Sequence, residues 1–157
     1  MLANIALIGL AFLRLVLGIV FAVVALYLAS SVLGRLTKGI DDWAEIGRGN
    51  VAVAIFMAGI FISVATIVAP GVAGLFAGWD LLAIAIGFIQ LIVALALAMA
   101  MQYVALSVFG KLTKDLDEWG ELKKGNVAVG ITMAAIVIAV AAVVLKGVET
   151  LISAVFA

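Results

Sequence analysis

The sequence predicts an all-α integral membrane protein with four transmembrane helices, arranged as two parallel repeats of helix, surface helix and helix. Of its 157 residues, 68% are hydrophobic and 11% are charged, whereas about a quarter of the residues of a soluble domain are charged. Long stretches carry no charge, and the chain repeats itself at an offset of 76 residues. The bilayer is therefore the expected solvent, and membrane lipids are expected partners.

The composition also narrows the chemistry that the chain can perform. The formal net charge is zero, so no basic surface indicates a nucleic-acid partner. The chain has no cysteine and no histidine, which excludes disulfides, a thiol nucleophile, an imidazole base and the usual zinc sites. We expect no cofactor. The apolar start lacks the basic region of a signal peptide, and we interpret it as a retained first helix.

The repeat covers the whole chain without a gap. Trp43 corresponds to Trp119, and Asn50 corresponds to Asn126. Of the 25 positions in residues 34–58, 15 are identical in the second copy. This agreement predicts an internal duplication, with one repeat in residues 1–76 and the other in residues 77–157.

Each repeat contains two candidate membrane spans. A spanning helix needs about 20 predominantly apolar residues. Because residues 1–13 pair with residues 77–89 in the repeat, the first helix is expected to start near Asn4. Pro70 and Gly71 are expected to end the second span, and residues 147–156 to form a short re-entrant or surface helix. The stretches without acidic or basic residues are residues 15–33, 51–69, 81–109 and 127–145.

Two spans in each repeat make the repeats parallel, related by an axis along the membrane normal. Both charged loops, residues 35–49 and 110–125, then lie on one face of the membrane. They hold seven of the nine lysines and arginines. The positive-inside rule therefore places these loops in the cytoplasm and both termini outside. We expect a multi-pass protein of the cell inner membrane.

The second charged loop is predicted to form a short amphipathic helix on the membrane surface. Thr113 is a candidate N-cap, and Trp43 and Trp119 are candidate interface anchors, because tryptophan favours the headgroup zone. Asn50 and Asn126 each follow a glycine and are predicted to cap the next span. The apolar stripe of this surface helix consists of Leu112, Leu116, Trp119 and Leu122.

The segments from Glu45 to Ile55 and from Glu121 to Ile131 carry an acid five residues before the asparagine of a Gly-Asn pair at the start of a span. They resemble the signature of the domain-of-unknown-function family 350. The resemblance extends over the whole chain through the duplication. It implies a small prokaryotic inner-membrane protein built of two-helix units, and it implies no activity.

Two sets of polar residues are candidate functional sites. Glu45 and Glu121 belong to acidic clusters that either form a paired carboxylate site or solvate the surface helices, and the equal numbers of acids and bases favour solvation. Arg14 and its duplicate Gln90 lie in apolar surroundings. They either line a path or bind a lipid headgroup, or Arg14 extends to the outer interface.

Three functional hypotheses follow. The first is a non-enzymatic scaffold or accessory subunit that forms a homo-oligomer larger than a dimer, because small residues recur four apart on the spans and allow close helix packing. The second is a channel or transporter for a small solute, with Arg14 and Gln90 on its path. The third and weakest is a membrane enzyme that uses the carboxylates of the loops; we expect that the protein is not an enzyme.

Overall fold

The computed structural model describes residues 2–36, 40–74, 76, 81–114 and 116–156. These residues form helices and no strand, and the four long helices are each long and apolar enough to cross a membrane. The predicted fold class, an all-α membrane protein of two helix–short helix–helix repeats, is confirmed. The elements are α1 (Leu2–Leu36), α2 (Asp42–Gly47), α3 (Val51–Gly74), α4 (Leu81–Leu112), α5 (Glu118–Lys123) and α6 (Val127–Phe156).

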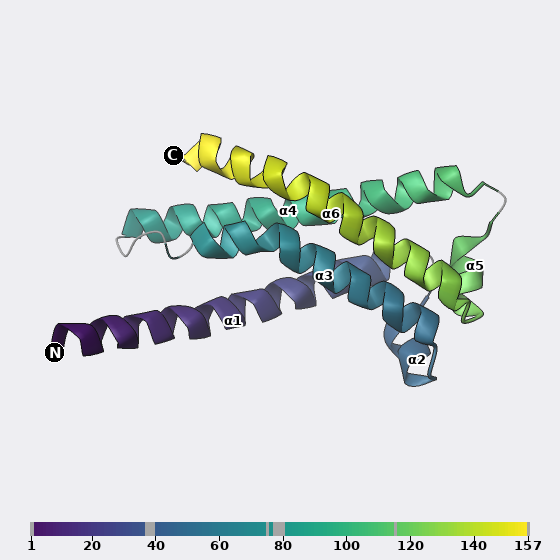
Figure 1. The fold of residues 1–157 in the computed structure, drawn as a ribbon, viewed down its shortest axis with the longest axis horizontal. Coiled ribbons are helices and arrows are strands. Elements are labelled where there is room, and N and C mark those ends of the chain that lie inside the picture. The colour runs from purple at the N-terminus through teal and green to yellow at the C-terminus, as the bar shows by residue number, and fades with distance from the viewer. Residues whose placement is uncertain (1, 37–39, 75, 77–80, 115, 157) are drawn as a thin grey trace.

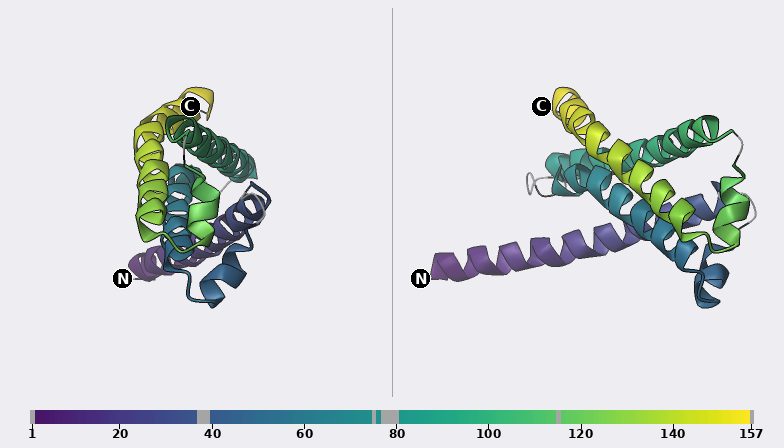
Figure 2. Two further views of the ribbon diagram at one scale, coloured as in Figure 1. Left: turned by 90° about the vertical axis from the view of Figure 1, so that its right-hand side faces the viewer. Right: turned by 45° about the vertical axis from the view of Figure 1, so that its right-hand side comes forward.

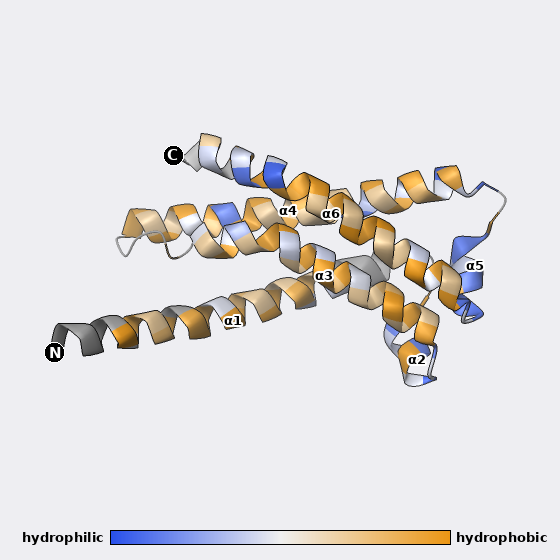
Figure 3. Cartoon of the chain, viewed as in Figure 1, coloured by the Kyte–Doolittle hydropathy of each residue, from blue (hydrophilic) through white to orange (hydrophobic). Residues whose placement is uncertain are grey.

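The long helices run along one common direction (Figure 1). The short helices α2 and α5 lie together at one end, whereas the N-terminus and the C-terminus lie at the opposite end. Hydrophilic residues gather on α2 and α5, and a second polar segment lies near the end of α6 (Figure 3). The predicted parallel arrangement of the two repeats is therefore present, with both charged loops on one side.

Helix α3 lies at the centre, and it meets its duplicate α6 in a close crossing. A Cβ atom added at Gly59 would lie 2.6 Å from the Cα atom of Ala134, and one added at Gly130 would lie 2.5 Å from the backbone oxygen of Ala52. Position 59 corresponds to position 135, and position 54 corresponds to position 130. The two helices thus run parallel and touch at nearly equivalent places, as a pseudo-two-fold relation requires.

The remaining long helices pack on α3 unequally. At Gly71, an added Cβ atom would lie 2.8 Å from the Cβ atom of Ala94, so α4 approaches the backbone of α3. On the other side, Gly18 of α1 lies next to the side chains of Val72, in α3, and Phe76, which follows α3. Apolar residues of α1 and α3 line a groove of about 310 Å³ between these two helices.

Two expected helix ends were wrong. Helix α3 continues through Pro70 to Gly74, and α6 continues without a break to Phe156. Proline removes one backbone hydrogen bond, but membrane helices tolerate it where neighbouring helices stabilise the backbone. The contact of Gly71 with α4 supplies such a neighbour. Residues 147–156 therefore extend helix α6 and form no separate surface helix.

Candidate functional site at the charged end

The short helices begin at aspartates rather than at the predicted threonine. The carboxylate of Asp41 accepts a hydrogen bond from the backbone N–H of Ala44 (3.1 Å), and the carboxylate of Asp117 accepts one from Gly120 (3.1 Å). Thr113 instead donates to the backbone oxygen of Phe109 at the end of α4 (2.9 Å). The prediction that Thr113 caps the surface helix was therefore wrong.

The predicted apolar stripe is divided among three segments. Leu112 ends α4, Leu116 lies in the connection, and Trp119 and Leu122 lie in α5. An aspartate is a strong N-cap, and acids in the first turn favour the helix start at Asp117. The surface helix is therefore only six residues long.

Each short helix ends in a tight turn that leads directly into the next span. Gly49 and Gly125 have φ values of 85° and 82°, a left-handed conformation that glycine adopts without steric cost. The backbone N–H of Asn50 donates to the oxygen of Glu45 (3.0 Å), and that of Asn126 donates to Glu121 (3.0 Å). This pattern is the Schellman motif of helix ends, and it places each asparagine at the start of a span.

The two asparagines link the acid of the short helix to the span that follows. Oδ1 of Asn50 accepts from the backbone N–H of Val53 (3.2 Å), and Nδ2 donates to Oε2 of Glu45 (3.2 Å). Oδ1 of Asn126 accepts from Val129 (3.4 Å), and its Nδ2 donates to Oε2 of Glu121 (2.9 Å). Both side chains therefore lie where N-caps lie, and the acid five residues earlier orients them.

A basic residue completes each network. Nη1 of Arg48 lies 2.9 Å from Oε1 of Glu45, and Nζ of Lys124 lies 2.7 Å from Oε1 of Glu121. The amide of Asn126, followed by Lys124, lowers the pKa of the Glu121 carboxyl below its ordinary value. The same carboxylate raises the pKa of Lys124. Each glutamate therefore joins an asparagine and a base at the end of its short helix.

The two networks differ in one respect. Nδ2 of Asn50 also donates to the backbone oxygens of Leu122 (3.1 Å) and Lys123 (3.2 Å), at the end of α5. Among the described residues, Nδ2 of Asn126 donates to Glu121 alone. The first repeat therefore holds the second at the charged end, and the sequence gives no sign of this asymmetry because the two motifs are nearly identical.

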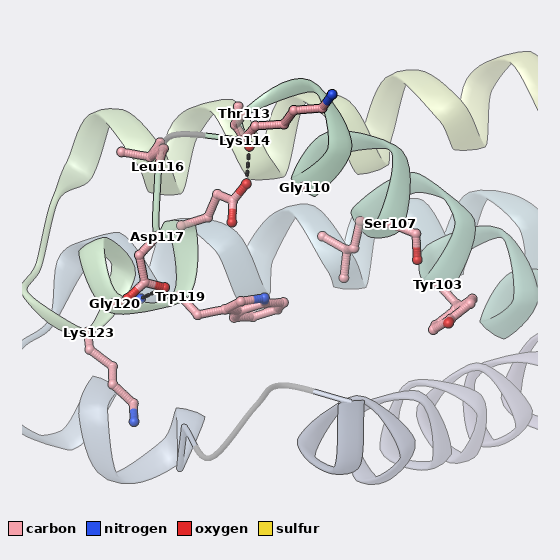
Figure 4. A pocket seen from close by; sticks show the side chains of 12 residues that line it. Tyr103, Ser107, Gly110, Thr113, Lys114, Leu116, Asp117, Trp119, Gly120 and Lys123 are labelled. Carbon is pink, nitrogen blue, oxygen red and sulfur yellow. Dashed lines mark hydrogen bonds between the residues drawn. The ribbon is translucent and has the colours of Figure 1, made fainter.

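A cavity of about 850 Å³ lies between α5 and the end of α4 (Figure 4). Tyr103 and Lys114 line it, and the indole of Trp119 points along it. Trp119 also packs edge-on against Phe56, with 5.8 Å between the ring centroids. Trp43, the other predicted anchor, is exposed, and the centroid of its ring lies 6.3 Å from that of Phe61.

The lining of this cavity carries charges of both signs. Its charged lining includes the bases Lys114 and Lys123 and the acids Asp117 and Glu118. Asp117 caps α5, and Glu118 is buried and hydrogen-bonded to the hydroxyl of Thr113. Among the described residues, no three metal-ligating side chains of His, Cys, Asp or Glu come together.

The other pair of candidate residues lies away from this end. The backbone of Arg14 belongs to α1, but its side chain lies outside the described part of the chain. Gln90 is buried in the contact between α4 and α3, where its Oε1 lies against Gly74 and has no hydrogen-bond partner among the described residues. A role for either residue in a path or in lipid binding stays a prediction.

Sequence reasoning assigned no role to a further polar pair in the spans. The side chain of Gln102 on α4 is buried, and its Nε2 donates to the hydroxyl of Ser63 on α3. The sequence indicates this hydrogen bond only by placing a glutamine and a serine within apolar runs, and neither residue indicates its partner. This pair joins the two repeats inside the predicted membrane region.

The fold and the charged end define a multi-pass, all-α membrane protein made of two tandem two-helix units. The family model named Domain of Unknown Function (DUF350) matches the chain twice, at residues 6–89 and 83–156. The chain belongs to this family, and the resemblance inferred from the Glu45 and Glu121 segments is confirmed. No curated protein and no solved structure gives a significant match to the chain.

Proposed function

We propose that the protein is a non-enzymatic membrane scaffold or accessory subunit whose working form is a homo-oligomer larger than a dimer. The proposal rests on the unequal burial of the spans within one chain. In the most apolar stretch of α3, 56% of the residues are buried, whereas in that of α1 only 6% are buried. Because packing rather than hydrophobicity drives helix association in lipid, an almost unpacked span is available to another chain.

The structural contacts that the carboxylates make support a role without catalysis. Glu45 and Glu121 are each held by an asparagine and a base. Asp41 and Asp117 cap short helices. General acid–base or nucleophilic catalysis needs a group that is free to exchange a proton or attack a substrate, and these carboxylates already serve the fold.

Native mass measurement of the full chain in lipid discs tests the oligomer. The expected result is a complex of more than two chains, each of 16.2 kDa, which persists across lipid compositions. A single chain per disc under all conditions would contradict the scaffold and leave the solute path as the better hypothesis.

We further propose that the protein resides in the cytoplasmic membrane, with α2 and α5 in the cytoplasm and both termini outside. Gly47 and Lys123 are equivalent exposed positions of the two short helices, and Ala154 is exposed near the other end. The native chain has no cysteine, so single variants Gly47→Cys, Lys123→Cys and Ala154→Cys give clean labelling. An impermeant maleimide should reach only Ala154→Cys from outside intact cells. Labelling of all three from one side would refute this topology.

A path for a small solute is the alternative, and one observation favours it. Gln90 and Gln102 are both buried on α4, and the Oε1 atoms of both lack a partner among the described residues. Unpaired polar atoms inside a span mark candidate paths. Solute flux into proteoliposomes that is lost in Gln90→Leu, in Arg14→Leu and in Gln102→Leu would favour this alternative. A wild-type chain that forms oligomers without any flux would favour the scaffold.

A further inference from the structure

The groove between α1 and α3 has an entirely apolar lining and a volume of about 310 Å³. On the α3 side, its floor is buried or half-buried, and its rim consists of exposed alanines. The floor residues are Val64, Val68 and Val72, and the rim residues are Ala65, Ala69 and Ala73. The groove is therefore open along its side, toward the surroundings of the two helices.

The groove lies in the half of the membrane that is farther from the charged end. Val64 lies roughly 20 Å along α3 from the helix start at Val51, in a hydrocarbon core of about 30 Å. From Val64 to Ala73 the groove follows α3 for roughly 14 Å, which is close to the hydrocarbon thickness of about 15 Å in one leaflet. Helix α1 diverges from α3 toward its N-terminus (Figure 1 and Figure 2), so this half of the pair opens to lipid.

The groove is too narrow for another helix. Its volume, spread over this length, gives a width of only about 5 Å, whereas a helix with its side chains is about 10–12 Å across. Side chains of a neighbouring helix enter such a groove as separate knobs, about 5–6 Å apart, and leave space between them. A single hydrocarbon chain fills it continuously, because carbon atoms of neighbouring groups pack about 4 Å apart.

The other ways to fill the groove are unfavourable. An empty groove deprives its lining of dispersion contacts. A buried water needs two to four polar partners, and the lining has no polar side chain. A lipid tail gains no hydrophobic energy by leaving the bilayer, but in the groove it packs against both helices. We infer that one acyl chain of a phospholipid, from the leaflet on the side of the chain termini, lies in this groove.

The second repeat lacks the small residues that make room for the chain. Ala25, Ala69 and Ala73 correspond to Met101, Leu145 and Glu149. The duplication by itself therefore does not require alanine at these positions. We expect one such lipid for each protein chain, held by the first repeat.

The acyl chain has a defined direction in this site. Gly18 of α1 lies next to Val72, and Leu26, which also lines the groove, lies about 12 Å farther toward the charged end. A lipid of the leaflet on the side of the termini therefore places its glycerol end near Val72 and the end of its acyl chain near Leu26. The chain must pass Ala69 to reach Leu26.

Photolabelling in liposomes of phosphatidylethanolamine and phosphatidylglycerol tests the inference. A small fraction of the lipid is phosphatidylcholine that carries a diazirine either near the glycerol or at the end of one acyl chain. Labelled residues are located by peptide mass mapping and compared with Val143, which is 80% exposed on α6. In the wild type, we expect the terminal diazirine to label Leu26 and the glycerol-side diazirine to label Val72, each several-fold more than Val143.

Ala69→Leu should block the groove. It copies Leu145 of the second repeat and places a branched side chain at the middle of the rim, where Ala69 is exposed and a larger residue is tolerable. Labelling of Leu26 should fall several-fold. The matched control is Ala142→Leu, at an exposed position of α6 outside the groove, and it should leave the labelling of Leu26 unchanged.

Three results overturn the inference. The first is wild-type labelling of Leu26 no higher than that of Val143, and the second is equal labelling of Leu26 in Ala69→Leu and Ala142→Leu. The third is an unlabelled groove together with a smaller native mass of Ala69→Leu in lipid discs, which means that a second copy fills it. The inference does not depend on the proposed oligomer, because a single chain per disc with a labelled groove rejects the scaffold and keeps the lipid site.

Discussion

Nδ2 of Asn50 lies 3.1 Å from the backbone oxygen of Leu122, a residue 72 positions later in the chain. The same amide group also binds Lys123 and Glu45. It therefore joins the end of α2, the start of α3 and the end of α5. Asn126 occupies the equivalent position in the second repeat and, among described residues, links only its own repeat.

This asymmetry predicts unequal effects of two identical substitutions. Asn50→Ala and Asn126→Ala each remove an N-cap, which costs typically ~1 kcal/mol. Asn50→Ala also removes the hydrogen bonds that its amide donates to the backbone oxygens of Leu122 and Lys123, and a typical hydrogen bond adds about 1 kcal/mol. We expect the free energy of unfolding, measured by denaturant titration in mild detergent, to fall further for Asn50→Ala. Equal losses would show that the link between the repeats contributes nothing.

Much of the fold could be predicted because the duplication constrains it. Matching Trp43 with Trp119 and Asn50 with Asn126 fixes two spans per repeat and puts both charged loops at one end. The helix ends were harder to predict. Pro70 was expected to stop α3, but packing of Gly71 against α4 outweighs the local preference. Thr113 is a possible cap by sequence, but Asp117 precedes two acids in the first turn and is the stronger signal by the same rule.

The second prediction concerns pH. The folded-state pKa of Glu121 lies below its ordinary value because Asn126 and Lys124 favour the carboxylate. The stabilisation is therefore present above the unfolded-state pKa of about 4.3, and it is lost as the pH falls through the folded-state pKa. We expect Asn126→Ala to raise the pKa of Glu121, and Lys124→Gln to raise it as well. Carbon-13 NMR titration of the Glu121 carboxyl measures both shifts, and an unchanged pKa in Asn126→Ala would remove the amide as the cause.

The third prediction concerns the crossing of α3 and α6. A methyl group at Gly59 would meet the backbone of Ala134, and one at Gly130 would meet the backbone of Ala52. Gly59→Ala and Gly130→Ala should each force the helices apart and destabilise the protein by about 1–3 kcal/mol. Gly9→Ala is the matched control, because nothing lies within 4 Å of an added Cβ atom there. Thermal unfolding in detergent compares the three variants, and similar melting temperatures would contradict the close crossing.

The candidate site could be predicted only in part, and symmetry is the reason. Glu45, Glu121, Asn50 and Asn126 were found because both copies preserve them. A motif present in two copies does not indicate which copy is covered by a neighbour, so the extra bonds of Asn50 could not be foreseen. The partners Ser63 and Gln102 lie 39 residues apart, and only the packing of α3 against α4 brings them together.

The last prediction concerns Ser63 and Gln102, and it uses the equivalent residues of the other repeat as a guide. Nε2 of Gln102 donates to the Ser63 hydroxyl, while the Oε1 atom of Gln102 has no partner among described residues. The Ser63 hydroxyl itself donates to the backbone oxygen of Ile60 (3.0 Å). Ser63→Ala should therefore leave a buried amide unpaired, whereas Gln102→Leu leaves Ser63 bonded and removes an unpaired oxygen.

Combining Ser63→Ala with Gln102→Leu reproduces the apolar pair Ala139 and Leu26 of the other repeat. We expect Ser63→Ala alone to be the least stable variant and the double variant to recover most of the loss, with a coupling of about 1 kcal/mol, as for other hydrogen bonds between membrane helices. Unfolding free energies of the wild type, both single variants and the double variant form a complete double-mutant cycle. Strictly additive effects would mean that the two side chains do not interact, and that α4 is held on α3 by apolar packing alone.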